Sequence, residues 1–220
     1  EELVLVADIG GGTSDFSVIR VGPQHRSRAD RSRDVLANSG VRVGGTDFDA
    51  ALSLASVMPF LGLGTRLVEK NLPMPGALYH ELAAWPTINF AYTYKNEREL
   101  VELVSLAREP EKVERLLKTV RQRLGHRLAF AVEDTKLALS AGKTACVPLG
   151  FLDAGLEIPA TRAEFDRAIE ARMDRLHKAA RGCIAAAGLG PAAIDTIFLT
   201  GGSCRVPAVR AAIARAAPSA

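Results

Sequence analysis

The chain has 220 residues with a formal net charge of +3, and 48% of its residues are hydrophobic and 24% charged. This composition is typical of a globular protein with one large domain or two small ones. The small net charge gives no reason to expect a nucleic-acid partner, and the longest apolar stretch, residues 52–63, is too short and too interrupted to span a bilayer.

The three cysteines, Cys146, Cys183 and Cys204, have neither metal-binding nor redox spacing. A reduced, cytoplasmic setting is therefore expected. The chain opens at Glu1 without a methionine or a signal peptide and runs directly into a predicted core strand. This start is what an excised fragment of a longer protein would have.

The N-terminal stretch predicts two strands joined by a glycine turn. Residues 3–9 are apolar except for Asp8, and residues 15–21 are rich in Val, Ile and Phe. Between them lies Gly10-Gly11-Gly12-Thr13. Glycines let backbone N–H groups approach an anion closely, so this turn is a candidate phosphate-binding loop.

The next segments predict a hairpin and a helix. Gly22-Pro23 ends the second strand, and a basic cluster follows that we interpret as a solvated hairpin tip, although it could also contact an acidic partner; it comprises His25, Arg26, Arg28, Arg31 and Arg33. Residues 34–38 predict a third strand. After Gly44-Gly45, Thr46 is expected to cap a helix that ends at Pro59.

The central part of the chain predicts a compact insertion followed by helices. Residues 60–96 carry many prolines and glycines, and we expect their aromatic side chains to pack a small core of their own. Apolar residues recur at three- and four-residue steps from about Pro110 to Ser140. That length could indicate a coiled coil, but Gly125 and the absence of a strict heptad favour a pair of helices.

The C-terminal part predicts further strands and helices. Residues 142–160 read as short strands, and Thr161 with Glu164 forms a capping box before a helix that stops at Gly188. A buried strand then leads into Thr200-Gly201-Gly202-Ser203, and a final helix covers residues 207–217.

Two of the glycine turns, after Asp8 and after Thr200, each follow a buried strand. Ligands of α/β sheets bind at such strand ends, so a nucleotide could place its phosphates at the first turn and its nucleoside at the second. A carboxylate beside a phosphate loop can hold Mg²⁺ through water, which makes Asp8 the candidate metal residue. Other nucleotide motifs are excluded, because Asp15 replaces a Rossmann glycine and Leu137 replaces the first glycine of a P-loop ending at Lys143-Thr144.

Four segments resemble the nucleotide-binding domain of DnaK-type heat-shock chaperones (the heat shock protein 70 family) in the actin-like ATPase superfamily. Residues 8–15 resemble the second phosphate motif, 44–49 the following Gly-Gly-x-Asp-Phe-Asp turn, 133–140 the adenine-ribose helix, and 197–207 the adenosine motif. The resemblance implies an α/β fold: a ribonuclease H-like lobe with a mixed sheet plus a helical and β outer subdomain.

The resemblance also implies a domain layout. Residues 1–44 and 160–220 would form the inner subdomain of the second lobe, and 45–159 the outer subdomain. An enlarged insertion at about 58–110, with the segment 108–113, suggests the divergent YegD-like branch.

The resemblance implies the following roles. Asp8 would order the Mg²⁺ shell and the attacking water together with Thr13, and the phosphates of ATP or ADP would lie against the first turn. The implied nucleotide-binding residues are Gly10, Gly11, Gly12, Thr13, Gly45, Glu133, Lys136, Ser140, Gly201, Gly202, Ser203 and Arg205. Where the family has an arginine that stacks on adenine, this chain has Leu137, which can pack on the base without the charge.

The implied function is the second lobe of a stress-response chaperone ATPase, with nucleotide, unfolded client proteins and co-chaperones as partners and no nucleic acid or membrane. Nothing in the chain resembles the first phosphate motif or the lysine of the first lobe, so the fragment alone is expected to hydrolyse ATP poorly. Two alternatives remain: a nucleotide-regulated interaction module without turnover, and a sugar kinase or polyphosphate phosphatase of the same superfamily.

Overall fold

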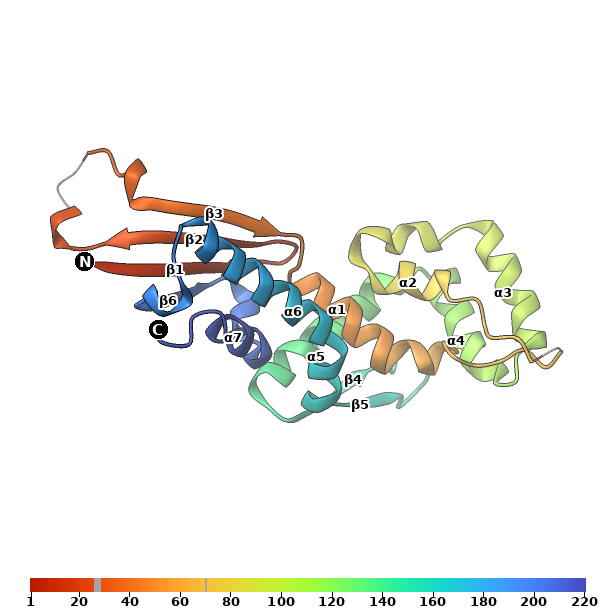
Figure 1. The fold of residues 1–220 in the computed structure, drawn as a ribbon. Helices are drawn as coiled ribbons and strands as arrows, with labels where there is room; N and C mark the ends of the chain where they lie inside the picture. The colour runs from red at the N-terminus through yellow and green to blue at the C-terminus, as the bar shows by residue number, and fades with distance from the viewer. Residues whose placement is uncertain (26–28, 70) are drawn as a thin grey trace. The chain divides into compact units, whose positions relative to one another are not determined.

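The structure is a computed structural model that describes residues 1–25, 29–69 and 71–220 (Figure 1). These residues separate into two compact units, Glu1–Asp47 with Glu170–Ala220, and Phe48–Ile169. Each unit is described by itself below.

The first unit is built on a four-stranded mixed sheet with the order β3-β2-β1-β6 (Figure 1). β1 pairs antiparallel with β2 and parallel with β6, and β2 pairs antiparallel with β3. The strands are β1 (Glu2–Ile9), β2 (Ser14–Val21), β3 (Val35–Val41) and β6 (Thr196–Thr200). β6 therefore lies at an edge of the sheet, and its Phe198 side chain is 59% exposed.

Helices cover the inward face of this sheet. Leu5, Ala7 and Ile9 alternate along β1 and are fully buried. The Cys183 thiol lies 3.4 Å from the Phe16 carbonyl, which fixes α6 (Arg162–Ala186) against β2. The C-terminal α7 (Pro207–Ala214) buries Val209 and Ile213 and is shorter than the predicted 207–217.

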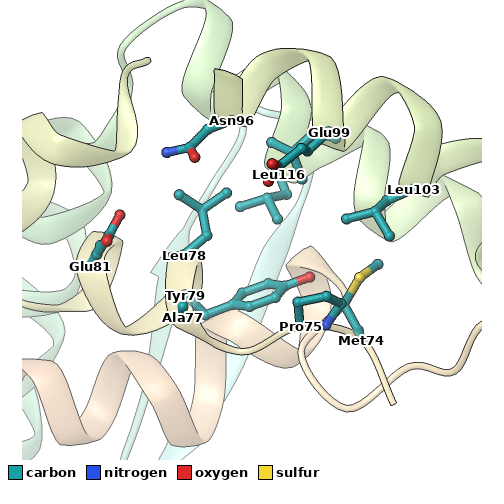
Figure 2. A pocket seen from close by; sticks show the side chains of 11 residues that line it. Met74, Pro75, Ala77, Leu78, Tyr79, Glu81, Asn96, Glu99, Leu103 and Leu116 are labelled. Carbon is teal, nitrogen blue, oxygen red and sulfur yellow. The ribbon is translucent and has the colours of Figure 1, made fainter. Parts of the chain in front are cut away.

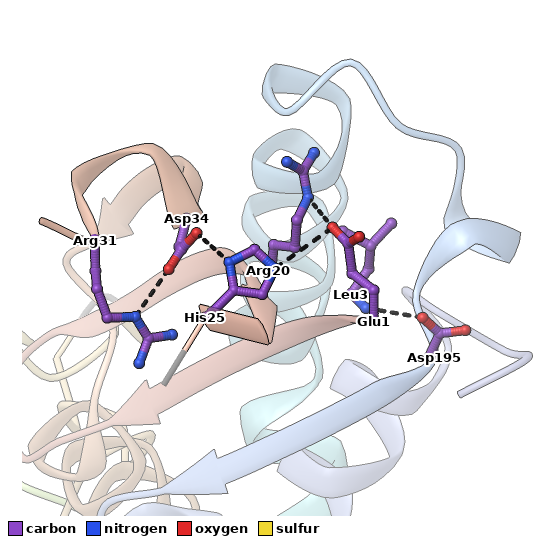
Figure 3. Close-up of polar contacts among 7 residues, drawn as sticks. All are labelled: Glu1, Leu3, Arg20, His25, Arg31, Asp34 and Asp195. Carbon is purple, nitrogen blue, oxygen red and sulfur yellow. Dashed lines mark hydrogen bonds and ion pairs between the residues drawn. The ribbon is translucent and has the colours of Figure 1, made fainter. Parts of the chain in front are cut away.

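An ion-pair network closes the far end of the β2–β3 connection (Figure 3). The His25 Nδ1 and Asp34 Oδ1 atoms lie 2.9 Å apart, and Arg31 Nε donates to Asp34 Oδ2 at 2.8 Å. The Arg31 hydrogen bond holds the pKa of Asp34 below its ordinary value. Because His25 is buried, the prediction of a solvated tip is wrong for this residue; Arg26 and Arg28 of the basic cluster lie outside the described residues.

The second unit is mostly helical with one two-stranded antiparallel sheet, β4 (Thr144–Pro148) with β5 (Glu157–Thr161). Its helices are the C-terminal part of α1 (Gly45–Leu52), α2 (Ala77–Ala83), α3 (Tyr94–Leu106), α4 (Pro110–Arg121) and α5 (Gly125–Ala141). α1 is followed by a π-helical stretch, Ser53–Val57, so the predicted helix up to Pro59 ends early as a regular α-helix.

The predicted segment 110–140 is two helices. Arg123 adopts φ 53° between α4 and α5, and the Gly125 N–H donates to the Tyr92 hydroxyl at 2.8 Å. A Cβ on Gly125 would lie only 2.5 Å from that hydroxyl oxygen, so glycine is required where the chain passes the insertion. The coiled-coil alternative is therefore wrong.

The insertion aromatics only partly form a core. Tyr79 is buried, and its hydroxyl donates to the Leu61 carbonyl at 3.1 Å. Trp85, Phe90 and Tyr94 are exposed. The prediction of a self-packed aromatic core is thus wrong for these three side chains.

Candidate functional site

The β1–β2 turn presents unused backbone donors. The Gly10 N–H donates to the Thr13 carbonyl at 2.9 Å, which closes the turn. Within the described part of the chain, the N–H groups of Gly11, Gly12 and Thr13 have no hydrogen-bond partner, and all three residues are exposed. A Cβ built on Gly11 or Gly12 meets no atom within 4 Å. The turn therefore has both the donors and the open space that an anion requires.

The start of α1 fixes this turn from behind. The Gly45 N–H donates to the Gly10 carbonyl at 3.0 Å, and the Thr46 N–H donates to the Gly11 carbonyl at 2.8 Å. A Cβ on Gly44 would lie 2.6 Å from the Gly11 backbone, so only glycine fits there. Since the turn's carbonyl groups are bonded to α1, its free N–H groups are left to define the polarity of the exposed side.

The helix start differs in detail from the prediction. α1 begins at Gly45, so Thr46 lies inside the helix, and its hydroxyl donates to the Gly11 carbonyl at 2.9 Å. The Asp47 carboxylate instead accepts from the Gly44 N–H at 2.9 Å. The prediction of Thr46 as the capping residue is wrong, because a residue three positions after Gly44 is better placed to cap it.

The second glycine turn packs against the first. The Ser203 hydroxyl donates to the Gly10 carbonyl at 2.9 Å. Gly201 adopts φ +87°, and a Cβ there would lie 2.3 Å from the Ile9 carbonyl oxygen. Gly202 and Arg205 are exposed beside it. The structure thus brings the predicted residues at 8–13, 45 and 201–203 together in one unit.

A second carboxylate lies beside Asp8 that the sequence reasoning missed. Asp8 and Asp15 are directly opposite each other in the β1–β2 ladder, and both are exposed. Like charges placed opposite each other on one sheet face repel unless a cation lies between or near them. The hairpin register over four turn residues, 10–13, is the signal that could have identified Asp15.

This carboxylate pair fits Mg²⁺ better than a metal held by protein ligands alone. Among the described residues, no group of three or more histidine, cysteine or acidic side chains could hold a metal. Mg²⁺ keeps several waters and commonly takes only one or two carboxylates in addition to phosphate oxygens. Asp8 and Asp15 next to an anion-binding turn meet that requirement.

The residues predicted to contact the nucleoside lie on α5 in the second unit. Lys136 Nζ lies 2.9 Å from Asp49 Oδ1 and 3.0 Å from Oδ2, and both side chains are largely buried. The Ser140 hydroxyl donates to the Lys136 carbonyl at 2.9 Å. Glu133 is half-buried, and Leu137 is 46% exposed on the same helix.

Asp49 is the other residue that the sequence reasoning missed. Burial raises its pKa to about 6, against the opposing attraction of Lys136, and the nearby Glu133 charge raises it further. The Lys136 ammonium has a third N–H beyond the two directed at Asp49, so it can still donate to a ligand.

A comparison with protein families gives one match. The family described as Hsp70 protein matches residues 102–217, which is more than half of the chain. The chain belongs to the Hsp70 family. The match includes α5 and the second glycine turn, whereas the first turn at 10–13 lies before it.

Membership fits the fold. A mixed sheet with surrounding helices is the expected arrangement of an Hsp70 actin-like ATPase lobe, so the predicted fold class is confirmed. Domains of this family generally bind nucleotide and act in protein chaperoning. Within the described residues, no helix has the length and apolar character needed to cross a bilayer.

Proposed function

We propose that this chain is the second lobe of an Hsp70-type nucleotide-binding domain and that it binds ATP or ADP with Mg²⁺. The observation that supports this most strongly is the set of three unpartnered N–H groups at Gly11, Gly12 and Thr13, which α1 and Ser203 hold in place from behind. In this proposal, residues 1–44 and 160–220 are the inner subdomain and 45–159 the outer one.

The chain's own residues would act as follows. The N–H groups of the turn bind and orient the β- and γ-phosphates, because preorganised donors stabilise charge without rearranging. The Asp8 and Asp15 carboxylates hold the hydrated Mg²⁺, which when bound neutralises phosphate charge and orders water. Lys136 and Ser140 on α5 donate to the nucleoside, and Leu137 packs on the base.

Turnover by this chain alone is proposed to be slow. In-line phosphoryl transfer needs phosphates, metal and water positioned together, and the turn contacts them from one side only. The full-length protein is proposed to hydrolyse ATP and to act with clients and co-chaperones in the cytoplasm. Release of phosphate from the 220-residue chain at the rate of the full-length protein would contradict this.

A Gly12→Ala variant tests the phosphate site cleanly. A Cβ at Gly12 meets nothing in the folded chain, so stability should persist while the methyl group lies where phosphate would approach. Loss of a charge-assisted hydrogen bond corresponds to about a tenfold to hundredfold weaker MgADP affinity, measured by titration calorimetry on the full-length protein.

Gly182→Ala is the matched control. Its Cβ also has open space, but it lies within α6 rather than at the turn. We expect unchanged MgADP affinity and a stability gain of up to about 1 kcal/mol from the better helix former. Equal affinities for the two variants and the parent protein would remove the turn from the nucleotide site.

One observation favours the interaction-module alternative. Trp85 packs edge-on against Phe130 with ring centroids 5.2 Å apart, yet the two side chains remain 42% and 54% exposed. Exposed aromatic surface is enriched at protein interfaces. Nucleotide binding without any turnover in the full-length protein would favour this module, whereas turnover stimulated by unfolded peptide would favour the chaperone ATPase.

A further inference from the structure

The insertion encloses an apolar pocket between α2, α3 and α4 (Figure 2). Its volume is about 140 Å³, and all of its lining residues belong to the second unit. The apolar part of its lining consists of Met74, Pro75, Ala77, Leu78, Tyr79, Leu100, Leu103 and Leu116. A dry cavity of about 150 Å³ is large enough to bind benzene, so this pocket can hold one ring or one branched aliphatic group.

The polar atoms around this pocket are all hydrogen-bond acceptors. The Asn96 amide nitrogen is already used, because it donates to the Ala91 carbonyl at 3.0 Å, which leaves its Oδ1 as the free group. The Tyr79 hydroxyl donates away from the pocket, to the Leu61 carbonyl. The remaining polar side chains in the lining are Glu81 and Glu99.

The charge of the lining has one sign. None of the eleven lining residues is basic, and Figure 2 shows Glu81 and Glu99 on different sides of Leu78. The nearest printed cation partner is Lys95, whose Nζ is 3.7 Å from Glu99 in an exposed pair of little strength. An occupant that carries donors and a positive charge therefore complements this rim, and an anion is disfavoured.

We propose that this pocket binds a small primary amine that carries a single apolar group, with the group among the leucines and the ammonium at Glu81, Glu99 and Asn96. The ammonium has three donors and no acceptor, which matches a rim that offers only acceptors. The inference concerns the insertion alone and does not depend on nucleotide binding at the glycine turns.

Three probes of equal shape test the proposal on the full chain: 2-phenylethylammonium, the neutral 2-phenylethanol and the anionic 3-phenylpropionate. Affinities are measured by calorimetry at low ionic strength, with amide NMR shifts to place the probe at the pocket. We expect the amine to bind at least about tenfold more tightly than the alcohol and the anion to bind most weakly. The preference should shrink as salt is added, because the rim is partly exposed.

Substitutions then assign the preference to the rim. The double variant Glu81→Gln with Glu99→Gln should bind amine and alcohol equally while keeping the alcohol affinity of the parent chain. The control Glu102→Gln removes an exposed charge of α3 that does not line the pocket, so it should keep the tenfold preference.

The outcomes separate the alternatives. Equal binding of amine and alcohol by the parent chain would show an apolar cavity without charge selection and overturn the proposal. Binding of none of the probes at millimolar concentration would overturn it as well, as would a preference that survives in the double variant. Because both substitutions are at partly exposed glutamates, the thermal midpoint of each variant should match that of the parent chain and confirm that it is folded.

Discussion

Replacing Lys136 by methionine removes the counter-charge of a buried carboxylate in the second unit. The Lys136 and Asp49 side chains are only 9% and 17% exposed, and their charged groups are 2.9 Å apart. Breaking a buried pair by removing one partner typically destabilises a protein by about 3–5 kcal/mol, because the remaining charge stays desolvated. We expect a deficit of that size in the free energy of unfolding at pH 8.

The pH dependence of this deficit follows from the pKa of Asp49. Burial raises this pKa from 3.8 to about 6, so between these values the folded chain holds a proton that the unfolded chain has released. Stability is therefore largest below pH 3.8 and falls as the pH rises towards 6, by about 3 kcal/mol in total at 1.36 kcal/mol per unit. Without Lys136 the pKa of Asp49 rises further, and the fall continues above pH 6.

At pH 5, Asp49 is largely protonated in both proteins, and the parent chain carries a buried ammonium without a counter-charge. The methionine variant should then be as stable as the parent within about 1 kcal/mol, or more stable. Urea unfolding at pH 5, 6, 7 and 8 measures this, with Lys143→Met as the control because Lys143 is exposed. A deficit of the same size at every pH would refute the reasoning, since it would arise from packing rather than charge.

Three further results are expected. Gly44→Ala should lower the free energy of unfolding by about 2 kcal/mol or more, because its Cβ would overlap the Gly11 backbone at 2.6 Å; an unchanged thermal midpoint would contradict this packing. Asp34→Asn should destabilise the chain at pH 7 but not in acid, because a lowered pKa contributes stability that is lost as the pH falls below 3.8; a deficit that persists in acid unfolding would argue against the Arg31 contact. Asp8→Asn should reduce ATP turnover of the full-length protein by orders of magnitude without changing its thermal midpoint, and unchanged turnover would leave Asp8 a structural role.

The features that the sequence predicted well are local ones. The capping box is present, with the Thr161 N–H and hydroxyl donating to Glu164 at 3.1 and 2.7 Å, because both residues lie within one turn of helix. The strand–turn–strand at residues 3–21 is likewise coded by adjacent residues. The break near Gly125 was indicated by a single glycine in a helical pattern.

The features that the sequence could not predict depend on distant pairs. Asp49 and Lys136 are 87 positions apart, and no periodicity connects them. The pairing of Asp8 with Asp15 depends on the register of a hairpin rather than on residue type. The exposure of Trp85 was missed because hydrophobicity favours burial but does not determine which aromatic side chains the helices leave uncovered.

The position of β6 at the edge of the sheet has a consequence for handling this chain in solution. An edge strand presents a row of unpaired peptide groups that another chain can extend, and Phe198 adds an apolar contact on the same strand. Self-association through this edge would rise with protein concentration and would bury the strand that leads into Gly201. Ligand titrations on the 220-residue chain therefore belong at low protein concentration, and a Phe198→Lys variant offers a chain whose edge resists such pairing.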